Sequence, residues 1–156
     1  MPHLSNVEPA GAPVARLWRL ASWLLNQTAS QANRLVGEAL QQPGGRRRFA
    51  VLSGLEEFGP LSQAELSRRL GLDRSDLVAE LNQLEAHGWG LRAPDPGDPR
   101  RNAIRITPTG MAELHDLDRR ITAAHARLLD PLSPEEQELL AALLQRLLRH
   151  HAGYRP

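Results

Sequence analysis

The stretch from Pro94 to Asn102 constrains the fold more than any other part of the chain. Its residues are Pro-Asp-Pro-Gly-Asp-Pro-Arg-Arg-Asn, and the prolines and the glycine exclude both a helix and a central strand. The short segments on either side, 89–93 and 103–107, are typical of strands. The sequence therefore predicts a β-hairpin with a long, charged loop.

Two short helices are predicted directly before this hairpin. Ser62 and Glu65 have the spacing of a capping box for a helix over about 63–70. A glycine turn follows, and Asp73 can cap a second helix that runs to about His87. A helix–turn–helix followed by a two-stranded hairpin is the winged-helix arrangement, in which the second helix enters the major groove of DNA.

Longer helices are predicted on both sides of this unit. Apolar residues recur at helical spacing over 14–41, and a Pro-Gly-Gly break separates that helix from one over about 46–58. After the hairpin, Thr107 can cap a helix that has Pro108 at its first position, and a leucine-rich last helix begins near 133–136. We expect a mainly α fold with a small β-hairpin wing.

The composition excludes several classes of protein. Cysteine is absent, which excludes a disulfide scaffold, an iron–sulfur cluster and a thiolate zinc finger. No apolar run approaches the ~20 residues of a membrane span, and residues 1–13 lack the basic and apolar segments of a secretory signal. We expect a cytoplasmic protein with no cofactor, no bound metal and no membrane contact. All 19 basic residues are arginine, whose planar donor group suits phosphate and guanine.

Four segments of the chain closely resemble the MarR family of bacterial transcriptional regulators. They are GPLSQAELSRRLGL at 59–72, LEAHG at 84–88, RAPDPGDPRR at 92–101 and ITPTG at 106–110. The Asp98-x-Arg100 pair is the most specific element, and the likeness extends to the LSPEE start of the last helix at 132–136. The resemblance implies a winged helix-turn-helix module plus N- and C-terminal dimerisation helices.

The resemblance also implies an obligate homodimer that binds double-stranded DNA. We expect the DNA-binding module to span 46–107 and the dimerisation helices to span 14–45 and 108–152. These helices carry more Leu, Trp and Val than a thin winged module can cover, which independently indicates a partner. A twofold dimer places its recognition helices one helical turn apart, ~34–36 Å, so the operator should be a near-palindrome. Repression is the commoner behaviour in the family, so we expect a repressor.

The expected DNA contacts divide between the recognition helix and the wing. The set is Arg74, Ser75, Asp76, Asn82 and Gln83 from the helix, and Arg92, Asp98, Arg100 and Arg101 from the wing. Arg74 can read guanine or bind a phosphate, and Asn82 and Gln83 can read adenine. By resemblance, Arg100 inserts into the minor groove while Asp98 orients the wing.

The charge of the recognition helix is unfavourable for this role. Residues 73–87 hold one arginine against four carboxylates. We expect Asp73 to be used as a cap, and Glu80 and Glu85 to be solvated. The wing, 91–107, has four arginines against two aspartates and can compensate. The arginines at 46–48 are expected to form a solvated face, and those at 68 and 69 can lie along the DNA backbone.

Proteins of the MarR type are commonly released from DNA by a small, often phenolic or anionic ligand. It binds between the dimerisation helices and the winged module. In this chain Arg16 and Arg19 can offer a guanidinium to a carboxylate, beside an aromatic wall of Trp18 and Trp23. Tryptophans at this spacing also fit a core or a dimer interface, so both interpretations stay open. The lack of cysteine excludes the peroxide-sensing branch of the family.

Two other functions compete with DNA binding. One is an interaction protein that kept the fold and lost DNA binding, which the acidic helix favours. The other is a metal-dependent enzyme whose metal site is formed across a dimer by His115, Asp116 and Asp118. No zinc, hydrolase or phosphate-loop motif supports an enzyme, so we expect no catalytic residues.

Overall fold

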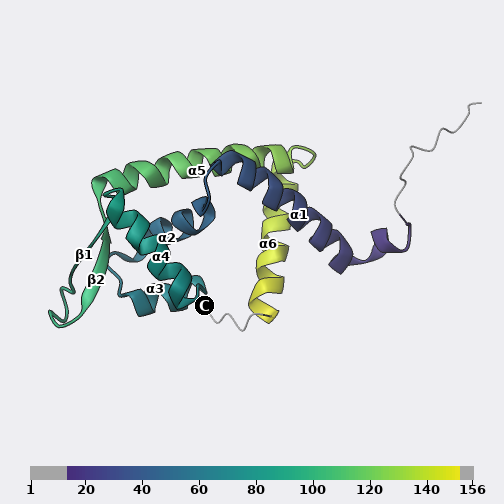
Figure 1. The fold of residues 1–156 in the computed structure, drawn as a ribbon. Coiled ribbons are helices and arrows are strands. Elements are labelled where there is room, and N and C mark those ends of the chain that lie inside the picture. Colours follow the sequence, from purple (N-terminus) through teal and green to yellow (C-terminus); the bar gives the residue numbers. More distant parts are fainter. Residues whose placement is uncertain (1–13, 152–156) are drawn as a thin grey trace, which may run out of the picture.

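The computed structural model describes residues 14–151 and is mainly α with one two-stranded hairpin, as predicted (Figure 1). In chain order the elements are the 3-10 turn η1 (Leu17–Arg19), α1 (Ala21–Leu40), α2 (Gly45–Phe58), α3 (Gln63–Leu70), α4 (Arg74–Ala86), β1 (Gly90–Pro94), β2 (Asn102–Ile106), α5 (Pro108–Leu129) and α6 (Pro134–His151). Helices α2 to α4 and the hairpin gather at one end of the molecule. Helices α1, α5 and α6 extend away from that end.

The predicted capping residues begin the helices of this module. The Ser62 hydroxyl accepts from the Glu65 N–H at 3.3 Å, and the Glu65 carboxylate accepts from the Ser62 N–H at 3.0 Å. The Asp73 carboxylate accepts from the Asp76 N–H at 2.8 Å. Thr107 caps α5 in the same way. These caps satisfy N–H groups that the first turn of a helix leaves without partners, and they confirm the predicted helix starts.

The predicted first helix, 14–41, is divided in the structure. Residues 17–19 form the 3-10 turn, Leu20 is extended, and α1 begins at Ala21. No residue of η1 is buried. The apolar residues before Ala21 therefore have no surface in the described chain against which a continuous helix would pack.

The hairpin is antiparallel and pairs Gly90 with Ile106 at one end and Pro94 with Asn102 at the other. Each strand is shifted by one residue from its prediction. Leu61 adds a short third segment, because its N–H and C=O both bond to Ile104, at 3.2 and 2.8 Å. No local sequence pattern predicts this bridge, which ties the α2–α3 connection to the wing.

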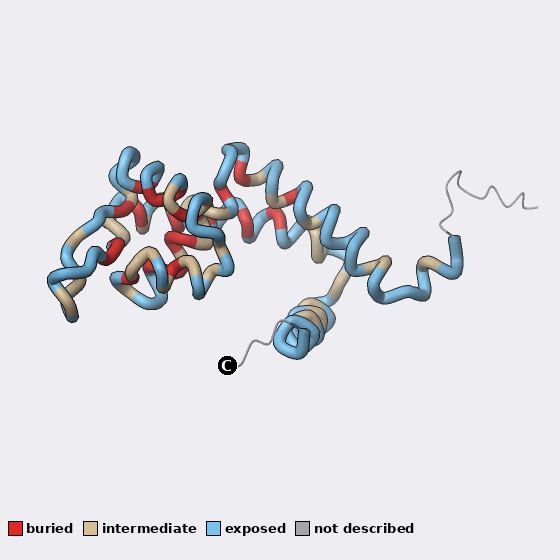
Figure 2. The backbone as a smooth tube through the Cα atoms, turned by 60° about the horizontal axis from the view of Figure 1, so that its bottom comes forward, coloured by how far each residue is buried: buried red, intermediate tan, exposed pale blue. Residues whose placement is uncertain are grey.

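The core lies where α2, α3, α4, the hairpin and α5 meet, and buried backbone is concentrated there (Figure 2). Its most deeply buried side chains are aliphatic: Val51, Leu52, Leu55, Leu66, Leu77, Leu81 and Leu84. The first turn of α5 closes tightly on this core. A Cβ atom added at Gly110 would lie 2.0 Å from the carbonyl oxygen of Trp89, so only glycine fits there.

Helix α6 packs little against the rest of the described chain. It contains no buried residue, and its large apolar side chains Leu139, Leu143, Leu147 and Leu148 are exposed. Together with α1 and α5 it encloses a groove of about 630 Å³ whose walls are mainly leucine and alanine. This apolar surface has no partner within residues 14–151.

No helix in the described part of the chain is both long and apolar enough to span a membrane.

Candidate nucleic-acid interface

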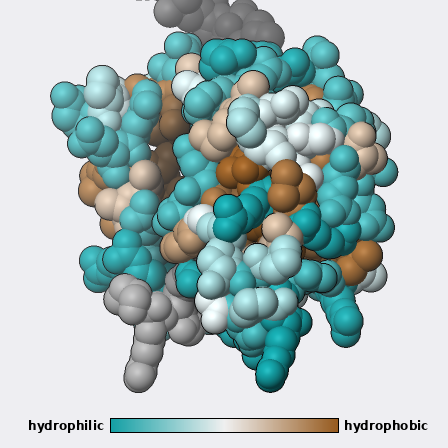
Figure 3. Space-filling view, turned by 90° about the vertical axis from the view of Figure 1, so that its left-hand side faces the viewer, coloured by the Kyte–Doolittle hydropathy of each residue, from teal (hydrophilic) through white to brown (hydrophobic). Residues whose placement is uncertain are grey.

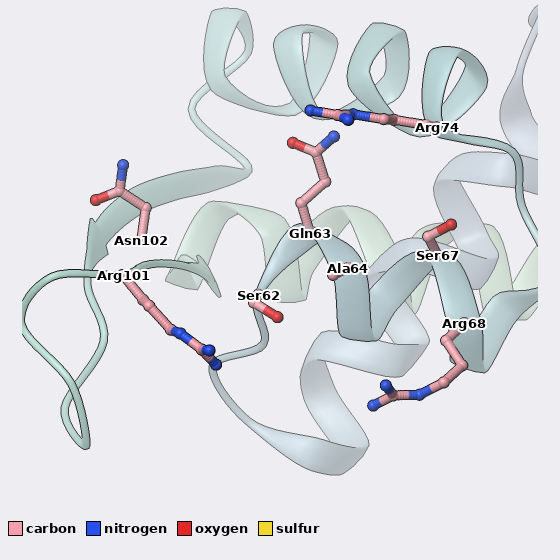
Figure 4. Close-up of a pocket in the computed structure, with 8 residues that line it drawn as sticks. All are labelled: Ser62, Gln63, Ala64, Ser67, Arg68, Arg74, Arg101 and Asn102. Carbon is pink, nitrogen blue, oxygen red and sulfur yellow. The ribbon is translucent and has the colours of Figure 1, made fainter.

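A basic groove of about 690 Å³ lies between α3, the start of α4 and the wing (Figure 4). Its lining residues are Ser62, Gln63, Ala64, Ser67, Arg68, Arg74, Arg101 and Asn102. The groove thus receives an arginine from each of three elements and no carboxylate from the described residues. This combination suits the phosphates of a nucleic-acid backbone.

Two of the groove arginines are available to an incoming phosphate. Within residues 14–151 neither Arg68 nor Arg74 forms an ion pair with a carboxylate. The third, Arg101, has its Nε 3.8 Å from the Asp98 carboxylate. At the wing end of the molecule most of the surface is hydrophilic, with apolar patches near the middle of the view (Figure 3).

The carboxylates of the recognition helix, α4, are paired with arginines from other elements. Asp76 lies 3.1 Å from Arg47 of α2, and Glu85 contacts Arg92 of β1. Glu80 lies 3.5 Å from Arg48 of α2. The negative charge that the sequence places on this helix is therefore balanced within the module. It no longer argues strongly against DNA binding.

The expectation that Glu80 is solvated is wrong, because only 4% of the residue is exposed. The expectation that residues 46–48 form a solvated face is also wrong for Arg48, which is 6% exposed. Arg46 binds Asn33 of α1 through the side-chain oxygen and the backbone carbonyl. The signal was present in the spacing: position 48 lies four residues before Leu52, and position 80 four residues before Leu84, on the buried helix faces.

The Arg48 guanidinium connects four parts of the chain. One terminal nitrogen, Nη1, donates to Gln42 Oε1 at 3.0 Å and to Glu113 Oε1 at 3.4 Å. The group also lies 4.4 Å from the centre of the Trp89 ring, at the base of the wing. Burial raises the pKa of the Glu80 carboxyl above its usual range, against the opposing attraction of Arg48. The network links the α1–α2 connection and α5 to the recognition helix.

The N-terminus of α4 is fixed by its cap. The Asp73 carboxylate accepts from the Asp76 N–H and from the Ser75 hydroxyl, the latter at 2.7 Å. These hydrogen bonds, that from the Asp76 backbone first, lower the pKa of the Asp73 carboxyl. The Ser75 proton is thus directed to Asp73.

Arg92 joins the wing to the recognition helix. Its backbone N–H donates to Glu85 Oε1 at 3.2 Å, and its Nη2 donates to Asn82 Oδ1 at 3.4 Å. The structure therefore brings together two residues that the sequence assigned separately to DNA contacts, Arg92 and Asn82. Gln83 lies exposed one position further along α4.

The tip of the wing is shaped by its two aspartates. Asp95 accepts from the Gly97 N–H at 2.7 Å, and Asp98 accepts from the Arg100 N–H at 3.1 Å. Arg100 is exposed at this tip. Asp98 thus holds the backbone N–H of the residue that projects from the tip, Arg100.

The four residues expected to bind a ligand lie at the far end of α1 from the winged module (Figure 1). Arg16 precedes η1, Trp18 and Arg19 belong to it, and Trp23 is in α1. The tryptophan rings are 6.2 Å apart and tilted, and Trp18 is 54% exposed. One chain therefore brings the two rings together, and it does not place them against its own winged module.

Within the described part of one chain, the residues considered for a metal-dependent enzyme do not form a metal site. Asp116 lies 2.9 Å from Arg119 and 2.7 Å from Arg120. Within residues 14–151 there is no group of three His, Asp or Glu side chains that could hold a metal ion.

Comparison with known proteins finds several similar chains. The sequence profile of the MarR family matches residues 45–101. The HTH-type transcriptional regulator PecS of Dickeya dadantii (strain 3937) is 30% identical over 131 residues, which cover 79% of each chain. A probable transcriptional regulator from Pseudomonas aeruginosa is 31% identical, with a TM-score of 0.72 over 85% of this chain and 99% of that one. The PcaV transcriptional regulator from Streptomyces coelicolor, in complex with its natural ligand, is 28% identical, with a TM-score of 0.67 over 87% of this chain and 96% of that one.

Proposed function

The chain belongs to the MarR family of transcriptional regulators, and we propose that it is a homodimeric repressor that binds a near-palindromic operator and is released by a small ligand. We assign DNA binding to residues 46–107 and dimerisation to 14–45 and 108–152. Residue 152 lies outside the described residues.

The basic groove carries the DNA-binding part of this proposal. Arg68, Arg74 and Arg101 line it, while the carboxylates of α4 are paired elsewhere. Phosphates in the groove position the module, α4 enters the major groove, and Arg100 reaches the minor groove from the wing tip. Asn82 and Gln83 face the base edges from α4, and Asp76, paired with Arg47, lies beside them. Arg92 supports Asn82 rather than contacting DNA independently.

The unpartnered face of α6 supports the homodimer. An 18-residue helix with no buried side chain gains little stability from its own protomer. A second copy can place its apolar face over the leucines of α6 and the groove between α1, α5 and α6. Such a twofold interface presents the two recognition helices to successive major grooves.

The ligand-bound structure of PcaV supports release by an effector. We propose a phenolic or otherwise anionic compound, held by Arg16 and Arg19 beside Trp18 and Trp23. Because these residues lie far from their own winged module, their site needs the module of the partner subunit. A ligand that binds only the DNA-incompetent arrangement lowers DNA affinity by the same coupling free energy.

A mobility-shift titration in a series of salt concentrations tests DNA binding. The probe is the promoter DNA beside the chain's own gene, with non-specific competitor. We expect a discrete complex whose affinity falls steeply with salt and which Arg100→Ala abolishes. Arg119→Ala, an exposed substitution on α5, serves as the control. A folded dimer that gives no complex at low salt would instead support the interaction protein that lost DNA binding.

Release is tested in the same assay with a panel of phenolic acids. We expect one class to dissociate the complex from the wild-type chain and to leave the complex of Arg16→Ala intact. If no compound acts, or if Arg16→Ala responds like the wild type, the proposed ligand site is wrong.

A further inference from the structure

The recognition helix presents one line of residues to the outside. Ser75, Ala79, Asn82 and Ala86 follow one another at spacings of four, three and four residues, which places them on one face of a helix. All four are exposed. The leucines at 77, 81 and 84 form the opposite, buried face. We name these four residues the outward stripe.

The outward stripe is uncharged and has short side chains. The carboxylates of α4 lie beside it or behind it, where Arg47, Arg48 and Arg92 hold them. At one end of the stripe the Ser75 hydroxyl donates to the helix cap. A methyl group, that of Ala79, therefore occupies the centre, followed by the amide of Asn82. With side chains this short, the helix backbone can come close to the base edges.

Few groups in the major groove of DNA make a favourable contact with a methyl group. In the major groove, every base edge presents hydrogen-bond donors or acceptors, and the C5-methyl group of thymine is the apolar exception. Opposite a donor or an acceptor, the Ala79 methyl would only displace water without replacing its hydrogen bonds. Opposite the thymine methyl, both apolar groups leave water together.

We propose that Ala79 is a specificity-determining residue that contacts the C5-methyl group of a thymine in each half-site of the operator. This inference rests on the proposed DNA binding by α4. Asn82, one turn further along and held by Arg92, faces the neighbouring base pair. The half-site should therefore contain an invariant thymine at the position under Ala79.

The experiment removes the methyl group from each partner in turn, from the thymine and from Ala79. Operator sequences are first selected from random double-stranded DNA with the full-length dimer. Each thymine of a selected half-site is then replaced by deoxyuridine, which lacks only the C5-methyl group. For the wild-type chain, deoxyuridine at one position should lower the affinity for DNA about fourfold, the value expected for one buried methyl-sized group. In Ala79→Gly, deoxyuridine at that position should cost nothing.

Two controls separate this contact from general effects. Ala112→Gly, at an exposed position of α5, loosens a helix to a similar degree and should keep the full preference for thymine. If Ala79→Gly does not fold, Ala79→Ser places a hydroxyl against the methyl group and should also reduce the preference.

Two results would overturn the inference while DNA binding stands. One is that deoxyuridine is tolerated at every position by the wild type, and the other is an equal loss in the wild type and Ala79→Gly. Failure to select any DNA would overturn the proposed function itself.

Discussion

Arg48 of α2 and Glu80 of the recognition helix form an ion pair inside the winged module, with Nε and Oε1 3.5 Å apart. A second carboxylate, Glu113 of α5, lies 3.4 Å from the same guanidinium. Pairs of this kind fix the relative position of the elements that carry them more than they stabilise the fold, because desolvation offsets most of the attraction. The pair therefore orients the recognition helix on its scaffold.

Loss of the Arg48 guanidinium should destabilise the fold. Arg48→Met leaves Glu80 and Glu113 without their shared partner, and we expect the free energy of unfolding to fall by about 3–5 kcal/mol. The double variant Arg48→Met with Glu80→Gln should recover part of this loss, because it removes one uncompensated charge. Urea denaturation of both variants measures the difference. Equal stability of Arg48→Met and the wild type would show that the network is not formed.

Loss of the buried Glu80 carboxylate should stabilise the fold at neutral pH, whereas loss of Arg48 destabilises it. Because burial raises the pKa of Glu80 above its ordinary value of 4.5, the folded chain keeps a proton there that the unfolded chain has already released. Ionisation then destabilises the fold as the pH rises through that interval. Glu80→Gln, which resembles the protonated form, should match the wild type at pH 4 and unfold at a higher temperature at pH 7.

Calorimetry of Glu80→Gln across this pH range tests the sign. Glu56→Gln, at an exposed position of α2, controls for the loss of a surface charge. A Glu80→Gln variant that is less stable than the wild type at pH 7 would contradict the expected direction.

The contact between Gly110 and Trp89 should not tolerate a methyl group. In Gly110→Ala the new Cβ would lie 2.0 Å from the Trp89 carbonyl oxygen, so α5 has to move relative to the wing. We expect a loss of about 3 kcal/mol, at the upper end of ordinary overpacking. Gly37→Ala in α1, where nothing lies within 4 Å, should instead be neutral or stabilise by up to ~1 kcal/mol. Denaturation midpoints of the two variants make the comparison.

The groove arginines should each account for part of the salt dependence of DNA binding. Arg68→Ala and Arg74→Ala each remove one proposed phosphate contact per protomer. The slope of log affinity against log salt should become shallower by about one unit per protomer for each variant. Fluorescence anisotropy at several salt concentrations gives the slope. If the slope of Arg74→Ala equals that of Arg119→Ala, the groove does not hold phosphate.

The leucines of α6 should control the oligomeric state. Leu143→Glu together with Leu147→Glu places charges on the exposed apolar face, so we expect a monomer in sedimentation experiments and weaker DNA binding. Gln145→Glu adds a charge to the same helix at another exposed position and should remain a dimer. A double variant that stays dimeric would place the interface elsewhere.

Elements with local signals could be predicted from the sequence. The caps Ser62, Asp73 and Thr107 fix helix starts through hydrogen bonds to residues three positions away, so their effect is written in neighbouring residues. The hairpin loop was equally readable from Pro and Gly. Strand ends shifted by one residue, and the turn before α1 was missed, because boundaries depend on packing that local patterns do not contain.

Non-local pairing could not be predicted. The carboxylates of α4 looked unfavourable because their partners, Arg47, Arg48 and Arg92, lie on other elements. The basic groove joins residues from 62 to 102, which only the fold brings together. The bridge between Leu61 and Ile104 is of the same kind. The spacing of apolar residues shows which face of each helix is buried. Arg48 and Glu80 lie on those faces, and their positions indicate that they are buried and paired.

The groove between α3, α4 and the wing draws its positive charge from guanidinium groups alone, since the chain has no lysine. Guanidinium groups do not deprotonate in proteins, so alkaline solution cannot discharge this surface. Acetyltransferases that neutralise lysine have no target on it either. Reagents directed at primary amines should likewise leave DNA binding intact, whereas dicarbonyl reagents that modify arginine should abolish it.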